Sequence, residues 1–204
     1  MRTRSSAHDT DHYAAVLVAS SAGGVLGLGT LLRGLGADLP VPVLVAQHLR
    51  RARRTQIVEV LSRATALPVQ LAEDGDHPKN GAVYLAPPDH HLCMREDGAF
   101  RLTDEKPINF ARPAADPLFE SAAHTYDGRV IACVLTGADS DGARGVEAVK
   151  DRGGTIVVQD PATAEFRGMP KSAIETGRVD HVLPLDGIGP AIARLLRAGS
   201  PDRR

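Results

Sequence analysis

The chain has 204 residues, of which 43% are hydrophobic, and its formal net charge is -1 at pH 7. This length predicts one domain with a full core, which we place at residues 13–199 between polar tails at 1–12 and 200–204. The near-neutral charge argues against binding of nucleic acid through an overall field. No apolar run approaches the roughly 20 residues that span a bilayer, so we expect no membrane insertion and a cytoplasmic location. Cys93 and Cys133 lie far apart on apolar runs, which is typical of reduced thiols.

Short apolar runs alternate with amphipathic stretches along the chain. The runs with strand character cover residues 13–20, 41–49, 82–87, 129–137, 154–160 and 179–185. Helices are predicted directly after the first run and, from apolar residues spaced three and four apart, at 55–65, 117–126, 142–152 and 189–199. The alternation predicts an α/β fold with three layers, in which helices cover both faces of a mainly parallel, doubly wound sheet. Asp97-Gly98 between two short runs indicates an additional small antiparallel hairpin.

Polar side chains follow three of the predicted strands at the points where these strands end. Ser21 closes the first run, His48 closes the second, and Asp139 and Asp141 follow the run over 129–137. Sites in open parallel sheets form outside the carboxyl ends of the strands, so we expect these side chains to converge. A serine, a histidine and a carboxylate are the parts of an acyl-transfer triad.

The glycine pair Gly23-Gly24 fits the same interpretation. Glycines let the backbone turn sharply into a helix and approach a substrate closely. The amides at the start of that helix would then point at the site, where they would stabilise an oxyanion.

The same residues also fit purely structural roles. Ser20 or Ser21 is a good N-cap for the helix that follows, and Asp141 is a good cap for the helix predicted over 142–152. Asp139 is a typical turn residue, and a single histidine such as His48 is often structural. A strand, a glycine-rich turn and a helix also begin a dinucleotide-binding fold, but "SSAGGVLGLG" does not contain G-x-G-x-x-G, and His48 stands where an acidic ribose ligand is expected.

The chain resembles the catalytic domain of the CheB family of bacterial chemotaxis protein-glutamate methylesterases, from about Ala15 to about Gly199. The matching stretches are "ASSAGG", "VAQH", "AEDGDHPKNGAVYLAPPDHHL", "ARPAADPLF", "VLTGADSDGARG" and "FRGMPKSAI", in the order of the family. The resemblance makes Ser21 the nucleophile, His48 the base and Asp141 the residue that orients the base. The chain order serine, histidine, aspartate differs from the order serine, aspartate, histidine of α/β-hydrolases, whose G-x-S-x-G elbow is absent from this sequence.

The resemblance implies hydrolysis of γ-glutamyl methyl esters on the cytoplasmic helices of chemoreceptors, with release of methanol. The resemblance also allows glutamine deamidation as a further activity of the same site. The backbone amides of Ala22 and Ala138 would bind the oxyanion, and neither a metal nor an organic cofactor is required. The alternative within the same fold is a catalytically weak or silent scaffold that binds a receptor or a receptor-modifying partner.

The chain also departs from the family pattern. Ala22, Ala138 and Ser140 stand where threonine, methionine and asparagine are common, which affects side-chain packing around the pocket but not backbone donors. Chemotaxis members usually carry an N-terminal receiver domain that covers the active site. Only about a dozen polar residues precede the first predicted strand here, so we expect regulation by a separate protein, or none.

Two charged segments near the site are candidates for substrate binding. "RRARR" begins at Arg50-Arg51, directly after Leu49, and either grips an acidic receptor surface or is merely a solvated helix start. His90 and His91 in "PDHH" are candidates for contact with substrate, because the resemblance places this segment near the cleft. Consecutive histidines rarely face one metal ion, so no metal is expected there.

Overall fold

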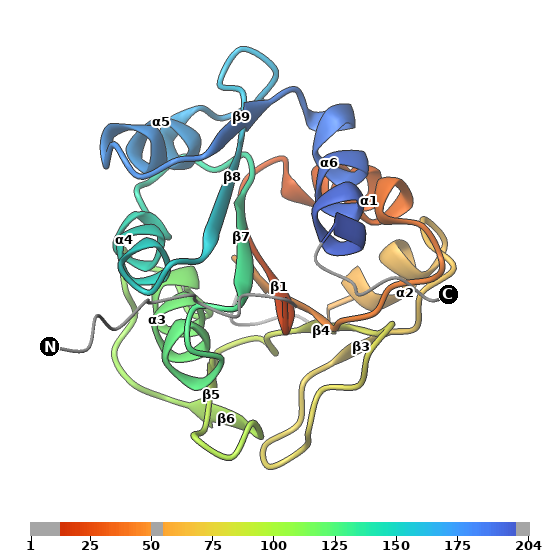
Figure 1. The fold of residues 1–204 in the computed structure, drawn as a ribbon. Helices are drawn as coiled ribbons and strands as arrows, with labels where there is room; N and C mark the ends of the chain where they lie inside the picture. Colours follow the sequence, from red (N-terminus) through yellow and green to blue (C-terminus); the bar gives the residue numbers. More distant parts are fainter. Residues whose placement is uncertain (1–12, 50–54, 199–204) are drawn as a thin grey trace, which may run out of the picture.

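The computed structural model describes residues 13–49 and 55–198, so both predicted tails lie outside the described residues. Seven parallel strands form the central sheet in the order β3-β4-β2-β1-β7-β8-β9 (Figure 1). Their bounds are β1 Ala15–Ser20, β2 Val43–Gln47, β3 Val69–Leu71, β4 Val83–Leu85, β7 Val130–Val134, β8 Thr155–Gln159 and β9 His181–Leu183. An antiparallel hairpin of β5 (His91–Met94) and β6 (Phe100–Thr103) lies apart from this sheet.

Six helices cover the two faces of the sheet in the described part of the chain (Figure 1). Their bounds are α1 Gly24–Leu35, α2 Ile57–Ser62, α3 Ala115–Thr125, α4 Ala143–Asp151, α5 Gly168–Glu175 and α6 Leu185–Ala198. Helices α1, α2 and α6 pack against one face and form one buried apolar cluster. Helices α3, α4 and α5 pack against the other face together with the hairpin and form the second cluster. The predicted three-layer fold and the hairpin are therefore confirmed.

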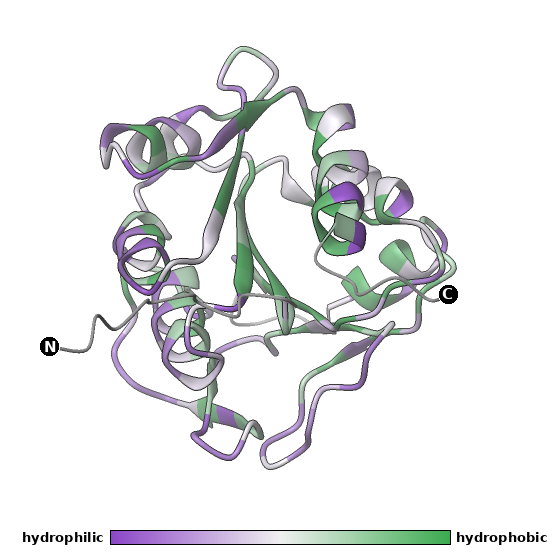
Figure 2. Ribbon diagram, in the orientation of Figure 1, coloured by the Kyte–Doolittle hydropathy of each residue, from purple (hydrophilic) through white to green (hydrophobic). Residues whose placement is uncertain are grey.

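The central strands are apolar on both faces because helices cover them on both sides. Every residue of β1, β2 and β7 is buried, and Figure 2 shows hydrophobic residues concentrated along these strands. Two elements were missed by the sequence analysis. β3 has only three residues, none of them fully buried. α5 contains Gly168 and Pro170 in its first turn, where proline is tolerated although it weakens the helical pattern.

The strand order brings three carboxyl ends together. β1 lies between β2 and β7 and pairs in parallel with both, with Ser20 opposite Gln47 in the register. The chain leaves β1 toward β2 on one side and later returns to β7 on the other, which makes this edge a topological switch point. The segments that follow β1, β2 and β7 consequently meet at one place.

Helices α3 and α4 are each capped by a carboxylate that comes from another part of the chain. α3 follows Ala114, whose side chain forms no capping bond within the described residues. Instead Asp141, which precedes α4, accepts the N–H of Ala115 at 2.6 Å and that of Asp116 at 3.2 Å. Asp116 in turn accepts the N–H of Gly145 in the first turn of α4 at 2.9 Å. This crossed pair of caps ties the start of α3 to the start of α4.

The pKa of Asp116 reflects this position. Burial and, to a smaller extent, the nearby charge of Asp141 raise the pKa from 3.8 to about 6, although the hydrogen bond from Gly145 opposes the shift. The fold therefore favours the protonated carboxyl. At neutral pH the protein holds an ionised carboxylate in a buried place, and this costs stability.

We expect Asp116→Asn to remove this pH-dependent cost, because asparagine keeps an oxygen for the Gly145 N–H but cannot ionise. In the wild type, the contribution of the protonated Asp116 carboxyl to the free energy of unfolding is complete below the unfolded pKa of 3.8 and is lost as pH rises through about 6. Relative to wild type, the free energy of unfolding of the variant should therefore gain up to about 3 kcal/mol between about pH 4 and about pH 8. Urea denaturation at both pH values measures this difference.

Asp38→Asn is the matched control, since Asp38 is an exposed carboxylate. Its effect on the free energy of unfolding should hardly change with pH. If Asp116→Asn behaves like Asp38→Asn across this range, the interpretation of Asp116 is contradicted.

Candidate active site

Ser21 lies at the turn that joins β1 to α1. Its N–H donates to the carbonyl of Thr136 at 3.0 Å, and its own carbonyl accepts the N–H of Gly24 at 2.9 Å. Gly23 precedes α1 with φ of 72°, a conformation that a side chain would strain. No side chain of the described residues caps α1. The alternative in which a serine caps this helix is therefore not what the structure adopts.

The Ser21 hydroxyl faces a histidine instead. Ser21 Oγ lies 2.9 Å from His48 Nδ1, and His48 Nε2 lies 2.7 Å from Asp141 Oδ2. A carboxylate oxygen accepts hydrogen bonds, so Nε2 is the ring nitrogen that donates to Asp141, and this leaves Nδ1 as the acceptor for the Ser21 hydroxyl. The three predicted residues thus form one continuous chain of hydrogen bonds that joins the ends of β1, β2 and β7.

Asp141 is buried completely, with 0% of its surface exposed. Its carboxylate accepts the two α3 amides described above in addition to the His48 ring, so its charge is stabilised by three N–H donors. The alternative role of Asp141 as the cap of its own helix is not realised, since α4 follows Gly142 without a side-chain cap from the described residues. Its carboxylate is aimed at His48 and held there.

The amide of Gln47 joins the backbones of Ser21 and His48. Its Nε2 donates to the carbonyl of Ser21 at 2.9 Å and to the carbonyl of His48 at 3.2 Å, and the side chain is buried. The sequence analysis assigned no role to Gln47. A polar residue at the end of the fully apolar run over 41–46 was the available signal.

The turn after β7 packs directly against Ser21. A Cβ at Gly137 would lie 3.0 Å from the Cβ of Ser21 and 1.9 Å from the sulfur of Met169. Only glycine lets the backbone approach so closely. The N–H groups of Ala22 and Ala138, predicted as oxyanion donors, bond to no acceptor among the described residues, whereas the Gly137 N–H is taken by the carbonyl of Phe166.

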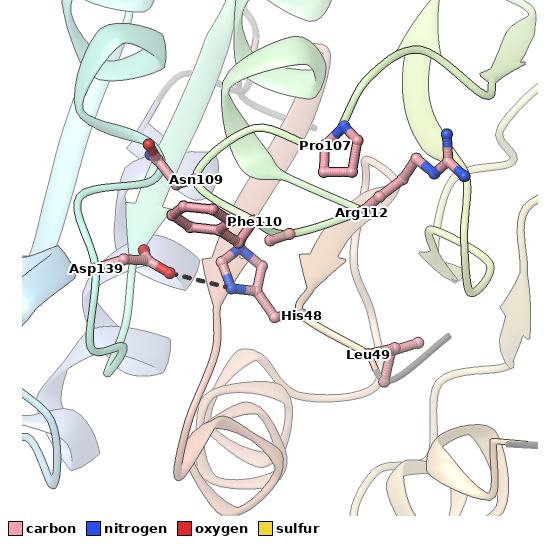
Figure 3. A pocket seen from close by; sticks show the side chains of 8 residues that line it. His48, Leu49, Pro107, Asn109, Phe110, Arg112 and Asp139 are labelled. Atoms are coloured by element: carbon pink, nitrogen blue, oxygen red, sulfur yellow. Dashed lines mark ion pairs between the residues drawn. The ribbon is translucent and has the colours of Figure 1, made fainter. Parts of the chain in front are cut away.

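An open cavity of about 490 Å³ lies beside the His48 ring (Figure 3). It is lined by His48, Leu49, Pro107, Asn109, Phe110, Ala111, Arg112 and Asp139. Figure 3 shows the loop over 107–112 as one wall of this cavity, with Phe110 beside the His48 ring. Phe110 is fully exposed, and its φ of 63° is rare for a bulky residue. The sequence analysis missed this loop, because neither the exposure nor the backbone conformation has a local sequence signal.

Arg112 anchors the loop. Its Nε and Nη2 bond to Asp89 Oδ1 at 3.0 and 2.8 Å, and its Nη1 donates to the carbonyls of Asp104 and Glu105. Only 12% of the Arg112 side chain is exposed. The guanidinium therefore joins three segments of chain into one rim of the cavity.

The structure places the two predicted histidines differently. His90 is exposed, and its Nδ1 lies 3.1 Å from the carbonyl of Pro88. His91 is buried; its Nδ1 accepts the N–H of Ala114 at 3.1 Å and its Nε2 faces the carbonyl of Lys106 at 3.3 Å. Burial lowers the pKa of His91, consistent with a neutral ring. His91 thus supports the start of α3 and presents no free nitrogen to a substrate.

Arg50 and Arg51 lie outside the described residues, so their predicted role in substrate binding stays a prediction. Within residues 13–49 and 55–198, no group of three or more histidine, cysteine, aspartate or glutamate side chains is arranged to hold a metal ion. Over the same residues, no helix is both long and apolar enough to cross a membrane.

Comparison with known proteins relates this geometry to a family. The family model described as CheB methylesterase matches residues 16–192. A protein of Leptospira interrogans is 39% identical over 184 residues, which cover 90% of this chain and 95% of the relative. The Caulobacter vibrioides protein named protein-glutamate methylesterase/protein-glutamine glutaminase 2 is 41% identical over 188 residues, and these cover 90% of this chain but 54% of that protein.

A solved structure shows the same fold. The crystal structure of the Thermotoga maritima CheB methylesterase catalytic domain superimposes with a TM-score of 0.85 at 37% sequence identity, covering 90% of this chain and 98% of that domain. The match extends over nearly all of the described residues, including the three strand ends that meet at Ser21, His48 and Asp141. The chain therefore belongs to the CheB methylesterase family.

Proposed function

We propose that this protein is a protein-glutamate methylesterase that hydrolyses γ-glutamyl methyl esters of chemoreceptors, with Ser21 as nucleophile, His48 as base and Asp141 as the group that orients the base. The observation that carries the proposal is the continuous chain of hydrogen bonds through these three residues. It opposes the alternative of a silent scaffold, because binding alone does not require a buried carboxylate, a ring and a hydroxyl in line. The names of the relatives support methyl esters of protein glutamate as the substrate class, and the chemoreceptor as the protein that carries them is part of our proposal.

The reaction follows from the positions of the protons. Ser21 Oγ attacks the ester carbonyl while its proton passes to His48 Nδ1, and the carbonyl electron pair becomes the oxyanion. The N–H groups of Ala22 and Ala138, which bond to no acceptor in the described part of the chain, are the donors we assign to that oxyanion. The proton on Nδ1 then passes to the methoxy oxygen, and methanol leaves. Water repeats the sequence on the acyl-enzyme and releases a glutamate carboxylate.

The same relay accepts a glutamine side chain, with ammonia as the leaving group in place of methanol. This second activity fits the double name carried by the relatives. Receptor helices that carry such side chains lie in the cytoplasm, where we place this protein. A separate regulatory protein acting on the open cavity beside His48 is compatible with this assignment.

Ser21→Ala should abolish methanol release from a methyl-labelled receptor cytoplasmic fragment. Loss of the nucleophile removes the acyl-enzyme route, so we expect a decrease in kcat of about 10⁴-fold or more. Ser20→Ala is the matched control, because Ser20 is buried next to the nucleophile and its Oγ has no hydrogen-bond partner among the described residues. Retention of near-normal activity by Ser21→Ala would overturn the proposed function.

Gly137→Ala should lower kcat/KM by about 10²-fold, since the added methyl group must displace the Met169 side chain, 1.9 Å away, and also presses on the Cβ of Ser21 at 3.0 Å. Gly187→Ala is the control, because a Cβ there meets no atom closer than 3.6 Å. Both variants are assayed with the receptor fragment, and circular dichroism verifies that they are folded. An active Gly137→Ala enzyme would show that close packing of this turn on Ser21 is not needed.

A further inference from the structure

Asp139 contacts the His48 ring from the side of the cavity. Its Oδ2 lies 3.4 Å from His48 Nδ1, the contact drawn as the dashed line in Figure 3, and the two form an ion pair when the ring is protonated. The side chain is 31% exposed and belongs to the lining of the cavity. The imidazole therefore has one carboxylate at each nitrogen, with buried Asp141 at Nε2 and half-buried Asp139 at Nδ1.

The two oxygens of Asp139 have separate contacts. Oδ1 accepts the N–H of Asp141 at 2.9 Å, which closes the turn that places Asp141. Oδ2 is left to face Nδ1, the atom that accepts the Ser21 proton. The residue thus has a structural contact and an electrostatic contact, and different substitutions separate them.

The electrostatic contact has different strengths in the two protonation states of the ring. When His48 is neutral, Nδ1 offers a lone pair to the Ser21 hydroxyl and gains nothing from a carboxylate nearby. When Nδ1 has taken the proton, it carries an N–H and a positive charge, and Asp139 attracts both. An interaction that strengthens as the reaction proceeds lowers the barrier.

We propose that Asp139 is a further catalytic residue, a second carboxylate that stabilises the His48 imidazolium formed after Ser21 gives up its proton. This inference rests on the proposed function. The proton moves from Ser21 Oγ to His48 Nδ1, where Asp139 Oδ2 faces it, and then to the leaving oxygen. Asp139 stays ionised throughout and exchanges no proton, so the overall reaction is unchanged.

The contact also predicts a difference in pH profile between the wild type and a variant without this charge. The charged groups that face His48 in the described part of the chain are Asp139 and Asp141, with Asp116 behind Asp141 and the Asp89-paired Arg112 across the cavity. Asp139 attracts the protonated ring and not the neutral ring. Removing its charge 3.4 Å from Nδ1, in contact with solvent, should therefore shift the acidic limb of the kcat/KM profile down by about one pH unit relative to wild type.

The test compares Asp139→Asn with Asp139→Ala across about pH 5 to 9. Asparagine keeps an oxygen for the Asp141 N–H and removes only the charge, whereas alanine removes both contacts. The readouts are the rate of labelling of Ser21 by a fluorophosphonate probe and the hydrolysis of p-nitrophenyl acetate, neither of which requires a receptor. Glu165→Gln is the control, since Glu165 is an exposed carboxylate beside Gly23 that does not contact His48.

We expect both Asp139 variants to show the downward shift of the acidic limb, Glu165→Gln to retain the wild-type profile, and Asp139→Ala to lose plateau activity as well. An Asp139→Asn limb that coincides with wild type overturns the inference, even if the plateau falls, because a purely structural role changes the plateau alone. An equal shift in Glu165→Gln also overturns it, since the effect would then be one of general charge. If wild-type Ser21 is not labelled at any pH, the proposed function fails and the role of Asp139 fails with it.

Discussion

The buried charge of Asp141 is the constraint on which the candidate site depends. A carboxylate with no exposed surface must be matched by hydrogen-bond donors, because an unpaired buried charge costs several kcal/mol. Here the donors are the first two amides of α3 and the His48 ring. The start of α3 must therefore lie against the β7–α4 turn, and His91 holds the adjacent amide of Ala114 in place. His91, which was expected to contact substrate, instead supports the start of α3, and the amides of α3 in turn hold Asp141.

The remaining geometry of the proposed nucleophile and base is set by the strand order. β2, β1 and β7 are neighbours, so the residues after them are brought to the same edge without any long loop. Fine adjustment comes from buried polar and small residues: Gln47 joins the carbonyls of Ser21 and His48, and Gly137 lets the turn after β7 lie against Ser21. These contacts are made by rigid elements, which is what holds a reacting hydroxyl at hydrogen-bond distance from its base.

The cavity side of the site is built differently. Its wall is the loop over 107–112, which Arg112 joins to Asp89 and to the carbonyls of Asp104 and Glu105. The loop carries the exposed ring of Phe110 next to His48, whereas Asp139 adds a carboxylate on the same side. Under the proposed function, the buried half of the site would carry the proton transfer, and the open half would present apolar and charged groups to a protein substrate.

The sequence by itself determined the layered α/β fold, the hairpin and the three residues at the strand ends, because hydrophobic periodicity and turn residues are local properties and parallel strands end at a common edge. It left open whether Ser21 and Asp141 cap helices or meet His48, since both roles use the same residue types at the same positions. Only the tertiary structure decided this, by capping α3 with a carboxylate from 26 residues further along the chain and leaving α1 uncapped by any described side chain. Likewise, the burial of His91, the bridge through Gln47 and the contact of Asp139 with the ring depend on which segments pack together, and no local pattern encodes such long-range contacts.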